Sequence, residues 1–155
     1  MSHKNILVAL DDSEITDLVL QQVLQFKAHN DCKIRLIHIV DATLIYHGGP
    51  GFDYLTVINA CLKDGQSLLD RAKQTLCSHA PFNVEQQIIE LKPFQGRIAE
   101  AIVKEAQEWG ADLLVMGTHG RRGFSHFILG SVAENIVRIA TMPVLLVPAR
   151  QNHEK

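Results

Sequence analysis

The sequence predicts an α/β protein with a five-stranded parallel sheet and helices on both faces. Five short apolar runs, each of strand length, alternate along the chain with longer segments. In those longer segments, apolar residues recur every three or four positions, which is typical of a helix with one buried face. Strands that alternate with helices are joined by right-handed crossovers, and these place the strands parallel in one sheet.

The amino-terminal third contains two predicted strands and one helix. Residues 6–10 form a continuous apolar run, as expected for a strand that helices cover on both faces. Asp11, Asp12 and Ser13 are capping residues, and we expect the first helix to start there. Its predicted buried face consists of Ile15, Leu18, Val19, Val23 and Phe26. Residues 33–40 are the second predicted strand.

The rest of the chain continues the alternation. Residues 41–54 contain Gly48-Gly-Pro-Gly51 and are predicted to be a long loop, a type of segment that is often functional. A helix then extends to about Ala80, and the third strand, residues 84–91, is expected near a sheet edge. A third helix ends near Gly110, and its predicted inward face consists of Ile98, Ala99, Ile102, Val103 and Ala106. The fourth strand is residues 113–116, and a fourth helix and the strand Val144–Val147 complete the pattern.

Length and composition indicate one domain. The chain has 155 residues, of which 46% are hydrophobic and 21% charged, and we expect one domain over residues 1–150 with a loose tail at 151–155. Its 15 basic and 17 acidic residues give a net charge of −2, which offers no electrostatic case for binding nucleic acid or an anionic membrane.

The cysteines and the apolar runs bear on disulfides, metal sites and cellular location. The three cysteines lack the spacing of a zinc site or a disulfide framework. No apolar run approaches the roughly 20 residues that a membrane span needs, and we expect a cytoplasmic protein.

The segment from Gly117 to Ser131 is predicted to hold phosphate. It joins a strand to a helix, and backbone N–H groups and a helix N-terminus can converge on an anion at such a junction. The glycines Gly117, Gly120 and Gly130 allow close approach of a ligand, and Ser131 would add a hydroxyl. The spacing is neither that of a Walker A loop nor the dinucleotide-binding G-x-G-x-x-G.

A simpler interpretation of this segment exists. Ser131 and Glu134 have the spacing of a capping box, so that Ser131 would only cap its helix, and Gly117 would only end a strand. Capping alone does not account for two further glycines and the basic sequence His119-Gly-Arg121-Arg122.

The topology predicts a single crevice. In open parallel sheets, ligands bind beyond the carboxyl ends of the strands, where the strand order reverses. If the first and fourth strands are neighbours there, Asp11 faces the glycine segment and supplies an acid for a sugar hydroxyl. The last strand, Val144–Val147, is short, apolar and flanked by prolines, which suits an edge strand, and we expect a homodimer through it.

These residues resemble the universal stress protein (UspA-like) family, in its ATP-binding branch. The resemblance extends over nearly the whole chain and rests on Asn5-Ile-Leu-Val-Ala-Leu-Asp11-Asp-Ser13, Leu36-Ile-His-Ile-Val40, Ala111-Asp-Leu-Leu-Val-Met-Gly117-Thr-His-Gly120, Leu129-Gly-Ser-Val-Ala-Glu134 and Pro143-Val-Leu-Leu-Val147. It implies a Rossmann-like, adenine nucleotide alpha-hydrolase-like fold with strand order 3-2-1-4-5, dimers through the fifth strand, and nucleotide-dependent regulation of an unidentified protein partner under stress.

The resemblance also implies a role for each site residue. Asp11 matches the acid that holds the ribose, Ile39 the residue whose backbone reads adenine, and Ala9 a residue beside the base. The phosphate contacts match Gly117, Gly120, Gly130 and Ser131, with a divalent ion such as Mg or Mn on the phosphates. Arg121 either reaches phosphate or is a solvated loop charge.

No catalytic residue is assigned from the sequence. His38 lies within an apolar strand and is expected to be a satisfied core residue, and no catalytic motif such as G-x-S-x-G or H-E-x-x-H is present. There is no P-loop lysine for ATP hydrolysis. Three functions remain: a regulatory ATP-binding module, which we favour, a slow ATPase or phosphate-transferring enzyme, and a dimeric interaction protein without bound nucleotide.

Overall fold

The computed structural model describes residues 3–28, 31–45, 49–51, 53–119 and 129–149. The strands are β1 (Asn5–Ala9), β2 (Lys33–Asp41), β3 (Asn83–Leu91), β4 (Leu113–Gly117) and β5 (Val144–Val147). The helices are α1 (Thr16–Val23), the 3₁₀-helix η1 (Leu24–Ala28), α2 (Ala42–Ile45), α3 (Tyr54–His79), α4 (Ile98–Trp109) and α5 (Ser131–Ile139).

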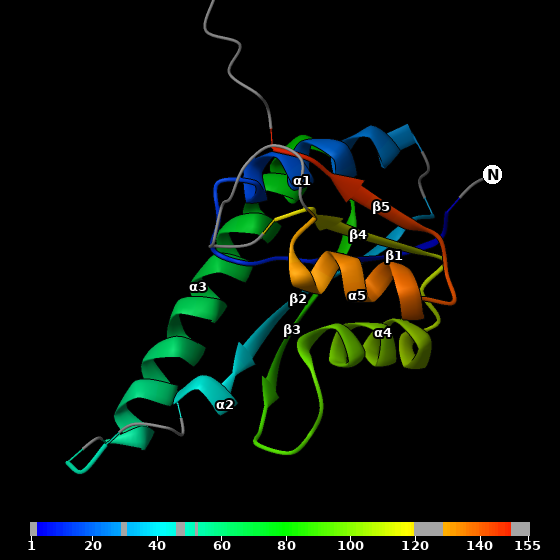
Figure 1. Cartoon of the computed structure of the whole chain (residues 1–155). Helices are drawn as coiled ribbons and strands as arrows, with labels where there is room; N and C mark the ends of the chain where they lie inside the picture. Colours follow the sequence, from blue (N-terminus) through cyan, green and yellow to red (C-terminus); the bar gives the residue numbers. More distant parts are fainter. Residues whose placement is uncertain (1–2, 29–30, 46–48, 52, 120–128, 150–155) are drawn as a thin grey trace, which may run out of the picture.

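The strands form one parallel sheet in the order β3-β2-β1-β4-β5, which confirms the predicted fold class and strand order (Figure 1). The central strand β1 pairs Ile6 with Ile34 of β2 on one side and with Leu113 of β4 on the other. Its continuous apolar sequence is explained by its position, because Ile6, Leu7 and Val8 are fully buried.

Helices cover both faces of the sheet because side chains alternate along each strand. Leu7, Ile37 and Leu114 pack in one apolar cluster with the inward residues of α4 and α5. The other face belongs to a second cluster that includes Ile6, Val8 and Leu36 together with residues of α1 and α3. The inner faces predicted from helical spacing are therefore confirmed.

Two predictions about the chain after β1 and β2 were wrong. Helix α1 begins at Thr16, and no side chain caps it. Instead, the Ser13 hydroxyl donates to Asp11 Oδ1 at 2.5 Å and the Thr16 hydroxyl to the Asp11 carbonyl at 2.5 Å, so these polar residues stabilise a turn. The predicted loop at 41–54 is partly regular, since it contains α2.

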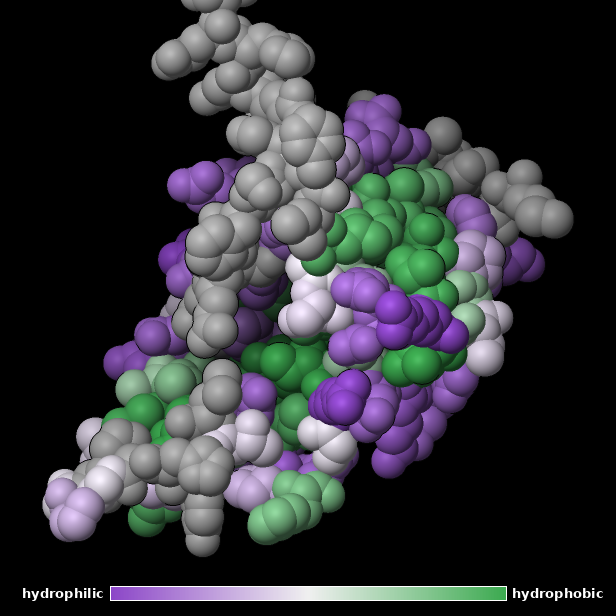
Figure 2. All heavy atoms as spheres, viewed as in Figure 1, coloured by the Kyte–Doolittle hydropathy of each residue, from purple (hydrophilic) through white to green (hydrophobic). Residues whose placement is uncertain are grey.

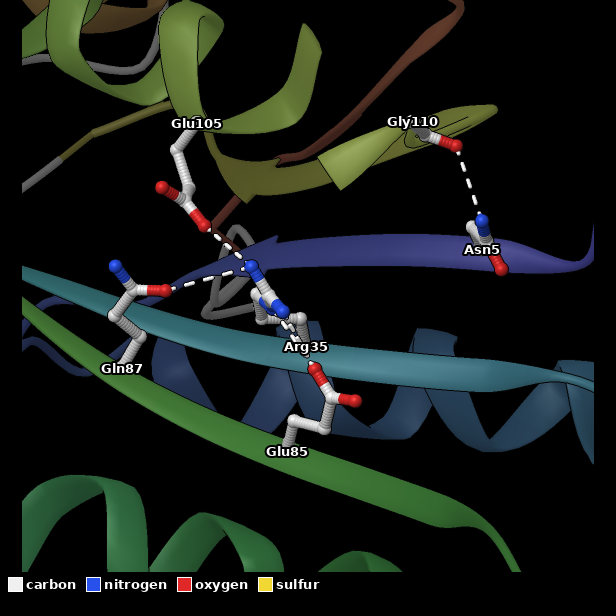
Figure 3. Close-up of polar contacts among 6 residues, drawn as sticks. All are labelled: Asn5, Arg35, Glu85, Gln87, Glu105 and Gly110. Carbon is white, nitrogen blue, oxygen red and sulfur yellow. Dashed lines mark hydrogen bonds and ion pairs between the residues drawn. The ribbon is translucent and has the colours of Figure 1, made fainter. Parts of the chain in front are cut away.

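A polar cluster around Arg35 joins β2, β3 and α4 (Figure 3). Its guanidinium donates to Glu85 at 2.7 Å and to Glu105 at 2.6 Å, and stacks 4.8 Å from the ring centroid of Trp109. Burial acts to lower the pKa of Arg35, but hydrogen bonds to Glu85 and Glu105 and the charges of these two acids outweigh it and raise that pKa. Arg35 therefore stays charged at neutral pH, and its contact with Glu105 joins α4 to the sheet.

Candidate functional site

A cavity of about 630 Å³ lies at the carboxyl ends of β1, β2 and β4. Six predicted site residues line it: Ala9, Asp11, Ile39, Gly117, Gly130 and Ser131. The other two, Gly120 and Arg121, lie outside the described residues. Residues far apart in the sequence thus meet at the edge of the sheet where open parallel folds bind ligands.

Backbone hydrogen bonds connect the residue after β4 to β5 and to the residue before α5. The Thr118 N–H donates to the Val147 carbonyl at 3.0 Å, and the Gly130 N–H donates to the Thr118 carbonyl at 2.8 Å. A Cβ at Gly130 would lie only 3.0 Å from that same carbonyl oxygen, so glycine allows this approach. The contact brings the amino terminus of α5 beside the carboxyl end of β4 and places at the cavity the first N–H groups of the helix, which have no partner within a helix.

Ser131 is the first residue of α5 and does not cap it. The N-cap residue is Gly130, which makes no side-chain cap hydrogen bond, and Glu134 instead pairs with Arg138 at 2.7 Å. The interpretation of Ser131 and Glu134 as a capping box is therefore wrong. Within the described part of the chain, the Ser131 hydroxyl has no hydrogen-bond partner, and it lines the cavity.

Gly117 has a packing reason to be glycine. It is the last residue of β4, and a Cβ there would lie 2.8 Å from Cγ2 of Ile15, next to the start of α1. Its φ is not positive, since the positive-φ glycines of the described residues are Gly51, Gly96 and Gly110. The sequence left open whether Gly117 contacts a ligand or only ends a strand, and the fold gives it a separate packing reason to be glycine.

Asp11 and Ile39 reach the cavity from the carboxyl-terminal ends of β1 and β2. Asp11 is half-buried; its Oδ1 accepts from Ser13, and no described residue donates to its Oδ2. Strand β2 continues past β1: its pairing with β1 ends at Ala9–Ile37, whereas its pairing with β3 continues to Asp41–Leu91. The backbone of Ile39 consequently has no β1 residue opposite it on the cavity side.

The cavity wall contains apolar residues that the sequence analysis did not assign to the site. Ile98 and Ile102 contribute from α4, Met116 from β4, and Val132 and Ala133 from α5. The helical periodicity had placed Ile98 and Ile102 on an inward face, but it could not tell core packing from cavity lining. The wall thus combines an apolar surface with a few polar groups, as in most small-molecule sites.

The universal stress protein family model matches residues 2–148. The chain belongs to this family. Universal stress protein MJ0577 of Methanocaldococcus jannaschii is 28% identical, with 97% of this chain and 98% of the relative covered. Its solved structure covers 98% of this chain and 100% of its own, with a TM-score of 0.84.

Two further solved structures share the fold. A universal stress protein in complex with cAMP is 22% identical with a TM-score of 0.67, covering 96% of this chain and 98% of its own. A universal stress protein from Archaeoglobus fulgidus in complex with dAMP is 21% identical with a TM-score of 0.63, covering 95% of this chain and 99% of its own.

The described residues contain no group of three or more histidine, cysteine, aspartate or glutamate residues placed to hold a metal ion. Nor does any helix among them have the length and apolar character of a membrane span.

Proposed function

We propose that this universal stress protein binds ATP in the cavity and acts as a nucleotide-dependent regulatory module in the stress response. The observation that carries the proposal is the contact between Gly130 and Thr118, which turns the N-terminus of α5 toward the same cavity as Asp11. A helix N-terminus favours an anion such as phosphate.

The described site residues match different parts of the nucleotide. Oδ2 of Asp11 is available to accept from ribose hydroxyls, and the backbone of Ile39 to pair with the adenine edge. Ala9 and Met116 offer apolar contact to the base, while the N–H groups at the start of α5 and the Ser131 hydroxyl donate to phosphate. Mg or Mn would be carried mainly by the phosphates. That solved universal stress proteins hold cAMP and dAMP supports an adenine nucleotide as the ligand class.

The first test is to purify the chain without added nucleotide, denature it and identify the released small molecules by mass spectrometry. Near one ATP per chain supports the regulatory module. Bound ADP instead favours the slow ATPase. A chain that releases no nucleotide and does not bind added Mg-ATP overturns the proposal and leaves the dimeric interaction protein as the better account.

Point variants then test the site itself. Asp11→Ala is expected to weaken ATP binding by at least tenfold because the ribose loses a charged acceptor. Ser67→Ala, an exposed hydroxyl change on α3, is the matched control. Glycine variants are poorer tests, because a Cβ at Gly117 would meet Ile15 at 2.8 Å and could unfold the site rather than empty it.

A homodimer through β5 is part of the same proposal. Strand β5 is a sheet edge, and Val144, Leu145 and Leu146 are only partly buried. Val137 and Ile139 of the neighbouring helix α5 are 54% and 41% exposed. Figure 2 shows apolar surface over β5 and beside α5. An exposed apolar surface along an unpaired edge is typical of a protein–protein contact.

Light scattering tests the dimer. The double change Val137→Asp and Ile139→Asp is expected to shift the chain to monomer, whereas Leu55→Asp, on an apolar residue that is 68% exposed on α3, is not. A monomeric wild-type chain at high micromolar concentration would contradict the proposal.

A further inference from the structure

The ring of His38 is held in one tautomer. Its Nδ1 lies 2.8 Å from the Leu10 carbonyl oxygen, which can only accept, so Nδ1 carries a proton, and in the neutral ring Nε2 presents a lone pair. The residue is only 9% exposed. The expectation of a satisfied core histidine is therefore half right, because one ring nitrogen has a partner and the other has none among the described residues.

The second nitrogen is open to the cavity. Among the described residues, the one solvent-inaccessible side-chain nitrogen or oxygen without a hydrogen bond is Oδ1 of Asp112. Nε2 of His38 also has no hydrogen bond among them, so it is accessible to solvent. His38 lines the cavity described above, on the sheet face that α3 covers. Because neighbouring side chains of a strand point to opposite faces, this ring lies on the opposite face from Ile39.

Gly65 provides the space for the ring. It lies inside α3, where glycine is the least favourable residue apart from proline. A Cβ at Gly65 would lie 2.6 Å from Cδ2 and 3.4 Å from Nε2 of His38. The helix thus keeps an unfavourable residue at the point where the ring edge approaches it, and this edge carries the unpaired nitrogen.

The surrounding wall offers acceptors rather than cations. Asp41, Asp64 and Cys61 line the cavity together with His38, and so does Asp12, whose carboxylate lies 4.0 Å from the guanidinium of Arg71. The described lining residues themselves include no lysine or arginine. Phosphate is disfavoured beside these carboxylates, whereas an uncharged or cationic group with N–H or O–H donors is favoured.

We propose that the α3 side of the cavity is a second binding compartment, which takes an amino or hydroxyl group and uses Nε2 of His38 as its acceptor. The donor belongs either to a nucleoside in the main cavity or to a separate small amine. The first source rests on the proposed function, and the second does not.

The experiment follows the His38 ring nitrogens by ¹⁵N NMR at pH 8, with adenosine and 1,4-diaminobutane as separate probes. Without ligand, we expect the tautomer with the proton on Nδ1. A probe that enters the compartment should shift the Nε2 resonance toward that of a hydrogen-bonded acceptor. Inorganic triphosphate, which carries no such donor, should leave it unchanged.

Variants make the test quantitative. The asparagine in His38→Asn can still donate to the Leu10 carbonyl but has no group at the Nε2 position. The affinity of this variant for the probe should therefore be about tenfold lower. Gly65→Ala should weaken it similarly by pushing the ring. Ser67→Ala, on the same helix, should change nothing, and circular dichroism should show that all three variants remain folded.

The outcomes separate this inference from the proposed function. A His38-dependent response to either probe supports the compartment, and a response to the diamine alone does so even if ATP does not bind. If ATP binds the wild-type chain but neither probe shifts Nε2 and His38→Asn binds adenosine normally, the compartment is refuted while the proposed function stands.

Discussion

The two ends of strand β1 use their polar groups differently. At the amino end, Oδ2 of Asp112 accepts from the N–H groups of Lys4 at 2.8 Å and Asn5 at 3.1 Å, and the Asn5 side chain donates to the Gly110 carbonyl at 3.1 Å. At the carboxyl end, Oδ2 of Asp11 and the Ser131 hydroxyl have no partner among the described residues. The comparison indicates that one end serves the fold and that the other is available to a ligand.

The amino end should therefore carry the larger stability effect. Asp112→Ala removes the acceptor of two backbone N–H groups, and we expect a loss of about 2–3 kcal/mol in the free energy of unfolding. Urea denaturation measures this loss, and ATP affinity should stay unchanged for the folded variant. A loss below about 0.5 kcal/mol would mean that water replaces the carboxylate at this end.

The carboxyl end should show the reverse behaviour. Ser131→Ala removes a hydroxyl with no partner among the described residues, so the unfolding free energy should change by less than about 0.5 kcal/mol. ATP affinity, measured by calorimetry, should fall about tenfold because the phosphates lose a donor. A destabilised variant with normal affinity would invert the comparison and restore a structural role for Ser131.

The Arg35 cluster on the inner side of α4 is a second group of polar residues that serves the fold. Arg35→Lys keeps the charge but loses the forked contact with Glu85 and the stacking on Trp109, and we expect a loss of about 1 kcal/mol in unfolding free energy. Thermal unfolding measures it, with the exposed Lys104→Arg as control. Equal stability of both variants would show that charge alone holds the cluster.

Much of the fold was predictable because it depends on local periodicity. Continuous apolar runs identified the covered strands, and helical spacing identified the inner faces of α1 and α4. The start of α1 was not predictable in this way. Asp11 and Ser13 are equally suited to a cap and to a turn, and the choice depends on the hydroxyl of Thr16, which reaches back to the Asp11 carbonyl.

The site was predictable to the extent that topology determines it. Strand order brings the end of β1 beside the end of β4, so Asp11 and Gly117 share one cavity. The reasons for individual residues were less accessible. From the sequence alone, Gly65 is only a residue that destabilises a helix. The fold shows that His38, which lies on β2 and 27 residues earlier in the chain, packs against it.

The smallest expected effect lies at the start of α3. Here, at the same end of the sheet as the cavity, a carboxylate stabilises the fold. Asp53 caps this helix, and its hydrogen bonds from the hydroxyl and the backbone N–H of Thr56 lower its pKa. A carboxylate with a lowered pKa in the folded state stabilises the fold above its unfolded-state pKa, and this stabilisation is lost as the pH falls through its folded-state pKa.

Asp53→Asn should therefore reduce the acid sensitivity of the fold, because asparagine caps a helix without a titrating charge. Urea denaturation at pH 7 and at pH 3 measures the change, and the difference between the two pH values should be smaller in the variant than in the wild-type chain. Asp70→Asn, an exposed acid in the interior of α3, is the control. If both variants reduce the difference equally, the effect comes from overall charge, and the cap contributes nothing specific at this end of the molecule.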